Sequence, residues 1–272
     1  MKPSLAMPVS STHLIILPSY NAGHRLATVV DEVAALGWEV LVVIDGSTDG
    51  SDLPVIEMAR SLPHLKVLHC PRNQGKGAAV LEGARAALGR GYTHALVMDS
   101  DGQHPVASVA AFMDASSRNP EAMIIGQPIF PANIPRERLH GRKLSNGLVR
   151  LELLGRGVND VLFGFRVYPL APLLAALSGR SGGRRYDFET EAAVRLAWAG
   201  VMPVNLPAPV RYLSREEGGI SHFHYVRDNA RLVVMHVKLL VELLLLRWPA
   251  LLRHRRTWKA HPAWTLQHRC LP

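Results

Sequence analysis

The chain is poor in cysteine and shows no hydrophobic leader, and each absence excludes a class of protein. Its two cysteines, Cys70 and Cys270, stand 200 positions apart. That spacing argues against a disulfide framework and against a cysteine-based metal cluster. The first dozen residues contain no apolar run of the kind found in signal peptides. We therefore predict an intracellular protein with reduced thiols.

Acidic residues are absent from the end of the chain, where basic residues gather. The formal net charge is +9, and residues 247–272 contain six Lys or Arg and no Asp or Glu. A mildly basic body with a strongly basic tail predicts contact with an anionic surface. The tail has no recognised nucleic-acid-binding motif and there is no basic face elsewhere, so we expect no nucleic-acid partner.

The composition indicates a globular chain, since 48% of the 272 residues are hydrophobic and 19% are charged. Neither an internal repeat nor a low-complexity linker divides it. We expect a flexible N-terminus over residues 1–11, one α/β domain over residues 12–228, and an amphipathic helix with a basic tail over residues 229–272.

Short apolar runs alternate with helical patterns through the first hundred residues. Strands are predicted at residues 13–17, 40–44, 65–69 and 95–98, and helices at residues 22–36, 52–62 and 77–88. Pro18 is expected to end the first strand. Strands that are apolar on both faces and alternate with helices predict an α/β fold with a mostly parallel sheet and helices on both faces.

Polar residues follow all four predicted strands, at the edge of such a sheet where ligands bind. They are Ser19, Tyr20 and Asn21 after the first strand, Asp45 after the second, Arg72 and Asn73 after the third, and Asp99, Ser100 and Asp101 after the fourth. Any one of them could merely cap a helix or form a turn. The four sets together indicate a binding site.

The residues after the fourth strand suggest a metal ion. Side chains two positions apart in an extended chain point the same way, so Asp99 and Asp101 repel each other unless a cation lies between them. Gln103 can add a carbonyl oxygen, and Mg or Mn prefers oxygen ligands. The alternative is a helix cap ahead of Pro105. A cation here could neutralise a departing nucleotide diphosphate.

Four segments in this order resemble the successive motifs of family 2 glycosyltransferases. They are PSYN at 18–21, VVIDGSTDGS at 42–51, RNQGKGAA at 72–79 and MDSDGQHP at 98–105. The resemblance covers residues 12–225 and is greatest to the branch with dolichyl-phosphate mannosyltransferase and bacterial polyprenyl-phosphate glycosyltransferases. It implies the GT-A fold and a nucleotide-diphosphate sugar as donor.

The resemblance also implies roles for single residues. The positions expected around the base and ribose are Pro18, Tyr20, Asn21 and Asp45, with Lys76 nearby. Asp99 is expected to face the ribose or the metal, and Asp101 and Gln103 to hold Mg or Mn. The sequence departs from the family pattern at Ile44, where the family usually has an acid, and at Ala22, where it often has Glu. Around Lys76, the spacing of a Walker phosphate loop is absent.

Three later segments complete the predicted site. Residues 164–166 resemble the family segment that frames the sugar, which assigns Arg166 to the donor; a buried strand start with a surface Arg is the alternative. In the acidic helix start at 185–191, the helix dipole alone favours acids, but Glu189 is expected at the donor and Glu191 matches the family's recurring acid. Residues 211–222 resemble a mobile loop whose Arg215 and His222 contact phosphates; a plain solvated loop is the alternative.

Residues 232–252 are apolar but interrupted by charges. Thirteen Leu and Val favour insertion into a membrane by about −6 kcal/mol, whereas Lys238, Glu242 and Arg247 oppose it by about +5 to +8 kcal/mol. The balance favours a helix that lies in the membrane interface, with the basic tail on anionic headgroups. A buried core helix or a homodimer contact is the alternative.

These observations predict a metal-dependent, inverting glycosyltransferase, peripheral on the inner face of the cell membrane. The acceptor is expected to be a polyprenyl phosphate or another lipid. One alternative is a hydroxyl acceptor with Glu191 as general base. Others are a nucleotidyltransferase, which would release pyrophosphate, and a catalytically inactive membrane-associated binding protein, against which Asp99 and Asp101 argue.

Overall fold

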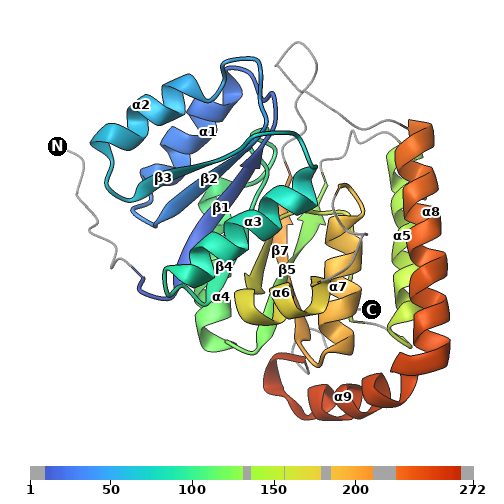
Figure 1. Ribbon diagram of the computed structural model, residues 1–272. Coiled ribbons are helices and arrows are strands. Elements are labelled where there is room, and N and C mark those ends of the chain that lie inside the picture. The colour runs from blue at the N-terminus through green and yellow to red at the C-terminus, as the bar shows by residue number, and fades with distance from the viewer. Residues whose placement is uncertain (1–9, 131–135, 156, 179–184, 211–224, 265–272) are drawn as a thin grey trace.

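The computed structural model describes residues 10–130, 136–155, 157–178, 185–210 and 225–264. A seven-stranded sheet with the order β3-β2-β1-β4-β6-β5-β7 forms its centre (Figure 1). The strands are β1 His13–Ser19, β2 Val40–Asp45, β3 Leu65–Cys70, β4 His94–Val97, β5 Ala122–Ile129, β6 Arg166–Pro169 and β7 Met202–Pro209. All neighbours are parallel except those of β6, which runs against β4 and β5. The predicted α/β class is confirmed.

Helices cover both faces of the sheet. They are α1 Arg25–Ala34, α2 Leu53–Ser61, α3 Lys76–Gly89, α4 Val109–Arg118 after the short turn η1 Val106–Ser108, α5 Arg136–Glu152, α6 Leu170–Leu177, α7 Phe188–Trp198, α8 Tyr225–Glu242 and α9 Trp248–Ala260. A π-helical turn, η2 Leu243–Arg247, joins α8 to α9. In Figure 1, α3, α6 and α7 lie in front of the sheet and α4 lies behind it.

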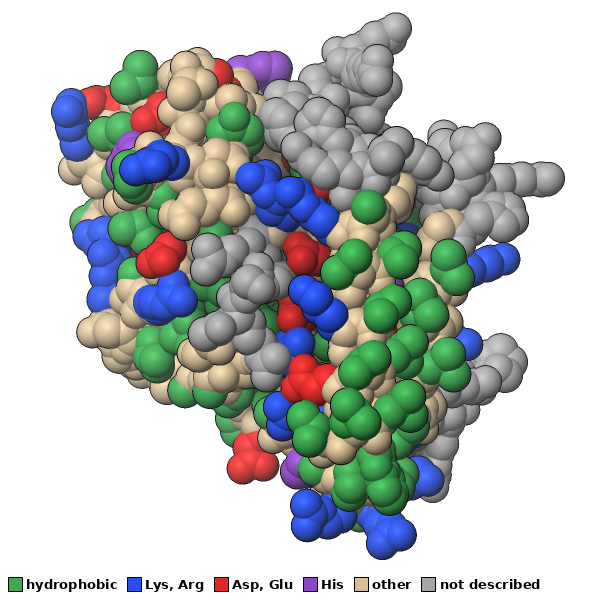
Figure 2. All heavy atoms as spheres, turned by 45° about the vertical axis from the view of Figure 1, so that its right-hand side comes forward, with side chains coloured by type: hydrophobic (Ala, Val, Ile, Leu, Met, Phe, Trp, Pro, Cys, Tyr) green, Lys and Arg blue, Asp and Glu red, His purple; other side chains and the backbone are tan. Residues whose placement is uncertain are grey.

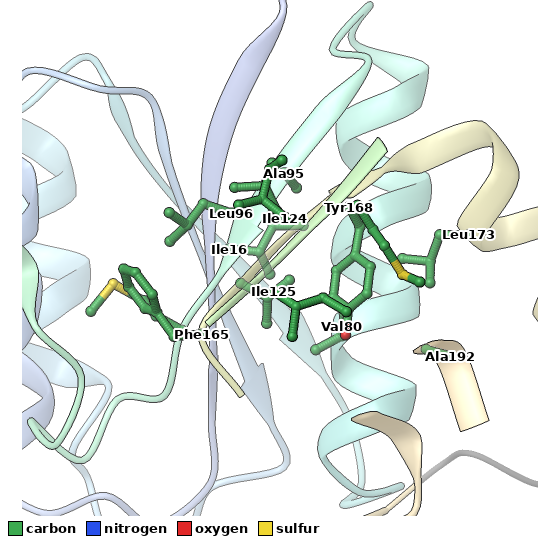
Figure 3. Packing of buried hydrophobic residues seen from close by; sticks show 14 of the residues in the cluster. Ile16, Val80, Ala95, Leu96, Ile124, Ile125, Phe165, Tyr168, Leu173 and Ala192 are labelled. Atoms are coloured by element: carbon green, nitrogen blue, oxygen red, sulfur yellow. The ribbon is translucent and has the colours of Figure 1, made fainter. Parts of the chain in front are cut away.

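One hydrophobic core joins the two halves of the sheet. Every residue of β1 and β2 is buried, as expected for parallel strands covered on both faces. Figure 3 shows Ile125 of β5 between Ile16 of β1 and Tyr168 of β6, with Val80 of α3 next to Tyr168. The reversed strand β6 therefore connects the four predicted strands, β1 to β4, to β5 and β7, which were not predicted.

The first strand is longer than predicted, because Pro18 does not end it. β1 continues to Ser19, and Pro18 pairs in register with Val43 of β2. On the other side, the pairing of β1 with β4 stops at Ile16. Pro18 therefore lies beyond the β4 ladder, where its missing N–H breaks no bond to that strand.

Helices α5, α8 and α9 lie outside the layers that cover the sheet. α5 and α8 stand side by side beyond α7, and α9 crosses below them (Figure 1). Of the helices in the described ranges, none is both long enough and apolar enough to cross a bilayer.

Candidate active site

The loops after β1 and β2 are tied together at the carboxyl edge of the sheet. The side-chain oxygen of Asn21 accepts a hydrogen bond from the backbone of Thr48 at 2.8 Å, and Ser47 Oγ accepts one from the backbone of Asn21 at 3.0 Å. Asn21 has φ 45°, a conformation that Asn tolerates better than most residues. Its amide therefore shapes the loop, and Tyr20 lies half-buried next to it.

Asp45 organises the loop that leads into α3. The side chain is buried, and its carboxylate accepts backbone hydrogen bonds from Gln74 at 3.0 Å and from Gly75 at 2.7 Å. The adjacent Gly46 has φ 68°, and a Cβ there would lie 2.5 Å from the backbone nitrogen of Asn73. The structure shows both oxygens holding this loop, and the predicted contact of Asp45 with the base or ribose stays a prediction.

Three predicted site residues from distant segments meet at the centre of this edge. Lys76, the first residue of α3, places Nζ 2.5 Å from Asp99 Oδ1 after β4, and it also pairs with Glu189 in the first turn of α7. The backbone of Gly164 lies against this group, since a Cβ there would be 2.7 Å from Lys76 Nζ and 3.3 Å from both carboxylates. We call Lys76, Asp99 and Glu189 the central cluster.

The charges of the central cluster stabilise one another. Burial alone would lower the pKa of Lys76, but the carboxylates of Asp99 and Glu189 outweigh it and raise that pKa. Burial likewise opposes ionisation of Asp99, yet the Lys76 ammonium brings the pKa of Asp99 below its usual value. Lys76 and Asp99 are therefore both charged at neutral pH.

His104 supports Asp99 from behind. Its Nδ1 accepts the backbone N–H of Asp99 at 2.8 Å, so the ring proton is on Nε2, which faces Asp99 Oδ2 at 3.6 Å. Burial lowers the pKa of His104 to about 4, and its ring packs edge-on against Phe163 and Phe165. The motif alone does not distinguish this histidine from an ordinary structural one, and its bond to the backbone of Asp99 accounts for its place beside the site.

Asp101 lies next to the central cluster, where the negative charge of Asp99 acts on it more strongly than the positive charge of Lys76. Burial, followed by the charge of Asp99, raises the pKa of Asp101 to about 6. The backbone N–H of Gln103 donates a hydrogen bond to Asp101 Oδ1 at 2.9 Å, and the Gln103 side chain takes no part in this bond. In the described part of the chain, no three His, Cys, Asp or Glu side chains form a metal cage. The predicted metal ligands are two carboxylates and one amide, so they would not form such a group of three.

Arg166 is not exposed to a donor. The side chain is fully buried, and its guanidinium donates to the backbone oxygens of Val161 at 2.7 Å, Phe163 at 2.9 Å and Glu189. These bonds hold the loop before β6 against the first turn of α7. The sequence predicted contact with the sugar, whereas the structure shows a buried residue that positions Glu189.

Glu191 is not brought to the central cluster. Its carboxylate accepts from Arg195 Nε at 2.7 Å, and Arg195 Nη1 donates to Glu242 of α8 at 2.8 Å. Residues two apart on a helix do not face the same way, so α7 presents Glu189 to Lys76 and turns Glu191 toward α8. The sequence favoured Glu191 as the family's acid. Which of Glu189 and Glu191 faces Lys76 depends only on the rotation of α7 about its axis.

Tyr186 is a residue that the sequence did not single out. Burial raises the pKa of its hydroxyl, and Lys76, Asp99, Asp228 and Glu189 all act on it electrostatically. It therefore lies between the central cluster and the start of α8.

Pro18 is buried in β1. Arg215 and His222 lie outside the described residues, and their predicted phosphate contacts stay predictions.

Comparison with solved structures identifies the class to which this fold belongs. A mannosyltransferase from Pyrobaculum calidifontis, solved with GDP-Man and Mn²⁺, matches with a TM-score of 0.57 at 18% identity over 96% of this chain and 81% of that one. Glucosyl-3-phosphoglycerate synthase from Mycobacterium tuberculosis, solved with Mn²⁺, UDP-Glc and phosphoglyceric acid, also gives 0.57, at 17% identity over 84% and 79%. The fold is that of the GT-A glycosyltransferases.

The sequence then identifies the family within that class. The model of glycosyl transferase family 2 matches residues 14–171, which is more than half of the chain. The chain belongs to this family, and it is a glycosyltransferase. The match includes Lys76, Asp99 and Asp101 and ends before α7.

Curated relatives place the chain in the polyprenyl-phosphate branch, as the motifs predicted. Polyprenol monophosphomannose synthase of Mycolicibacterium smegmatis is 31% identical over 79% of this chain and 82% of its own length. Undecaprenyl-phosphate mannosyltransferase of Micrococcus luteus is 28% identical over 75% of this chain and 85% of its own.

Proposed function

We propose that the protein transfers a sugar, with inversion, from a nucleotide-diphosphate donor to a polyprenyl phosphate. Both curated relatives described above are named for the transfer of mannose, which makes mannose the first sugar to test. The observation that carries the proposal is the pair Asp99 and Asp101 beside Lys76, at the carboxyl edge of a parallel sheet. Ligands bind outside this edge in open α/β sheets.

The residues at this edge fit a divalent cation. Asp101 has a raised pKa because it is buried near a second carboxylate, and a cation beside it would relieve that repulsion. Asp101 and Gln103 would hold Mg or Mn, together with Asp99. When bound, such an ion neutralises negative charge on the diphosphate leaving group.

The remaining chemistry requires little proton transfer. A phosphate monoester is ionised at neutral pH, so its oxygen can attack the anomeric carbon directly while the bond to the nucleoside diphosphate breaks. A single displacement of this kind inverts the anomeric carbon. Lys76 keeps Asp99 and Glu189 in place, and Arg166 fixes the backbone of Glu189. The protein's contribution is therefore positioning and charge stabilisation.

Donor binding tests the first half of the proposal. Thermal unfolding is measured with GDP-, UDP- and dTDP-linked sugars, each with Mn²⁺ and with a chelator. We expect one nucleotide class to raise the unfolding temperature, and we expect the chelator to abolish the rise. Stabilisation by none of the three would contradict the proposal.

Substitution of Asp101 tests the assignment of the site. Asp101→Asn should lower transfer to a polyprenyl phosphate by about 100-fold or more, because the cation that would neutralise the leaving diphosphate loses a carboxylate ligand. The matched control is Asp114→Asn, which removes an exposed acid of α4 that is 66% exposed and paired with Arg118. Equal activity of the two variants at limiting Mn²⁺ would contradict the assignment.

A hydroxyl acceptor remains the second candidate, with a different base from the one the sequence favoured. Glu189 lies in the central cluster and Glu191 does not. If a hydroxyl is the acceptor, Glu189→Gln should abolish transfer and spare donor binding. With a phosphate acceptor, Glu189→Gln should retain measurable transfer at neutral pH.

A further inference from the structure

Helix α8 has its polar residues on the inside. His236 is buried and its Nδ1 lies 2.7 Å from Glu152 of α5, and Glu242 pairs with Arg195 of α7. Apart from Lys238, the exposed side chains of α8 are apolar, and Val233 and Val237 are 62% and 56% exposed. A surface helix of a globular protein normally has the opposite arrangement.

The apolar surface continues onto the neighbouring elements. Leu244, Leu245 and Leu246 of η2 are 71%, 73% and 69% exposed, and Leu144 and Leu151 of α5 are 67% and 61% exposed. Figure 2 shows hydrophobic side chains gathered over this side of the molecule, with Lys and Arg at its lower rim. We call the outward side chains of α5, α8 and η2 the apolar face. Contiguous apolar surfaces of this kind mark interaction sites.

The exposed charged side chains on the elements of the apolar face and on α9 are all basic. Among the described side chains of α5, α8, η2 and α9, the exposed charged ones are Lys143, Arg150, Lys238, Arg253, Arg256 and Lys259. The acids on these elements are buried or paired inward: Glu152 with His236, Asp228 with Arg231, and Glu242 with Arg195 and Arg247. No acid follows Glu242 in the sequence.

We propose that the apolar face rests in the interfacial layer of a bilayer that contains anionic lipids, with the basic fringe on their headgroups. A row of exposed Val and Leu bordered by Lys and Arg is what such a surface requires. Trp248 is 48% exposed beside it, and tryptophan is typical of the membrane interface. The proposal rests on the proposed function in one respect: a lipid-linked acceptor is presented at a bilayer.

A second copy of the chain is a poorer occupant. A twofold contact through the apolar face would bring two basic fringes close together, with no exposed acid among the described side chains there to pair with them. Like charges facing each other across an interface oppose association. A bilayer with anionic headgroups supplies the missing negative charge.

Vesicle flotation tests the proposal with the full chain and no donor or acceptor. We expect binding to vesicles of phosphatidylcholine mixed with phosphatidylglycerol, and weaker binding to phosphatidylcholine alone. Leu244→Ser with Leu245→Ser should reduce binding by about tenfold or more. The control is Leu53→Ser with Leu88→Ser, which changes leucines of α2 and α3 that are 65% and 37% exposed; it should bind as the parent does. Circular dichroism checks that both variants are folded.

Several results would overturn the proposal. They are no binding of the parent to either vesicle, equal losses in the two double variants, or a dimer in solution that the Leu244 and Leu245 changes dissociate without any vesicle binding. Because the vesicles contain no acceptor, these results are independent of catalysis. Donor-induced thermal stabilisation reports separately on the proposed function.

Discussion

At the scale of single residues, Lys76 holds two acids that would otherwise repel each other. Its side chain is 19% exposed, and it pairs with Asp99 and with Glu189, which is 8% exposed. Lys76→Met leaves both carboxylates without their cation, and we expect the free energy of unfolding to fall by about 2–3 kcal/mol. Urea denaturation measures the loss. Donor-induced stabilisation should disappear as well, because the acids no longer keep their positions.

Two further variants separate these effects. Glu189→Gln added to Lys76→Met should restore part of the stability, since one unpaired charge is removed, without restoring transfer. Lys66→Met, at an exposed position of β3, is the matched control. If Lys76→Met unfolds at the same urea concentration as Lys66→Met, the central cluster does not stabilise the fold.

A histidine at the opposite edge of the sheet predicts pH-dependent stability. His13 of β1 is buried, stacks on His94 of β4 at 4.6 Å, and lies 3.1 Å from Ser116 Oγ. Burial, followed by the charge of His94, lowers the pKa of His13 to about 4 from the ordinary 6.5. Between these values the unfolded chain binds the proton and the folded chain does not, so stability is lost as pH falls from 6.5 toward 4.

Urea denaturation at a series of pH values tests this prediction. His13 should account for about 2 kcal/mol of stability lost between pH 7.5 and pH 5. His13→Gln should show a shallower decline over that interval, and His24→Gln, at an exposed position, should follow the parent. Parallel declines for all three proteins would show that His13 is protonated equally in the folded and unfolded states.

At the scale of elements, a buried polar pair attaches α8 to α5. Glu152 and His236 are almost completely buried, and Glu152 Oε2 and His236 Nε2 have no hydrogen-bond partner. Glu152→Leu leaves the histidine without its acceptor and should cost about 3 kcal/mol. The double change with His236→Leu should cost less than the two single changes together, because neither polar group then remains.

Hydrogen exchange locates this effect. Protection of the backbone amides in residues 228–242 should fall in Glu152→Leu and recover in the double variant. Amides of β1 and β2 should keep their protection in both. A loss spread evenly over the sheet would mean that the pair stabilises the whole domain rather than the attachment of α8.

The sequence predicted the elements of the first half of the fold well, because their signals are local. The four strands and three helices lie within a few residues of their predicted bounds, since each is a buried run or an amphipathic period that ends at glycine or a polar residue. The reversed β6 between β4 and β5 depends on contacts between segments far apart in the sequence. Periodicity contains no information about such pairing.

The same distinction applies to the site. The strand ends predicted where Asp45, Asp99 and Asp101 lie, because parallel strands share one carboxyl edge. They could not predict that Asp45 binds a backbone loop or that Arg166 is buried. The sequence also could not show that Glu189 rather than Glu191 faces Lys76, because this depends on how α7 is rotated against α3 and α8.

At the scale of the whole molecule, helix α8 links the surroundings of the central cluster to the apolar face. Tyr186 is within electrostatic reach of both Lys76 and Asp228 near the start of α8, and α8 then leads to the exposed leucines of η2. A protein held by this face keeps its site at a fixed position relative to the bilayer. Membrane contact should therefore matter for lipid-borne acceptors and not for the chemical step.

This separation can be measured by comparing two acceptors with one enzyme variant. Leu244→Ser with Leu245→Ser should reduce transfer to a long-chain polyprenyl phosphate in anionic vesicles by about tenfold, because fewer enzyme molecules are at the surface. Transfer to a short, water-soluble prenyl phosphate should be unchanged, since both leucines lie in η2, at the end of α8 opposite Asp228. Leu53→Ser with Leu88→Ser should behave as the parent with both acceptors. Equal losses with the two acceptors would show that these leucines support the catalytic domain itself, and the apolar face would then have no separate role in reaching the lipid.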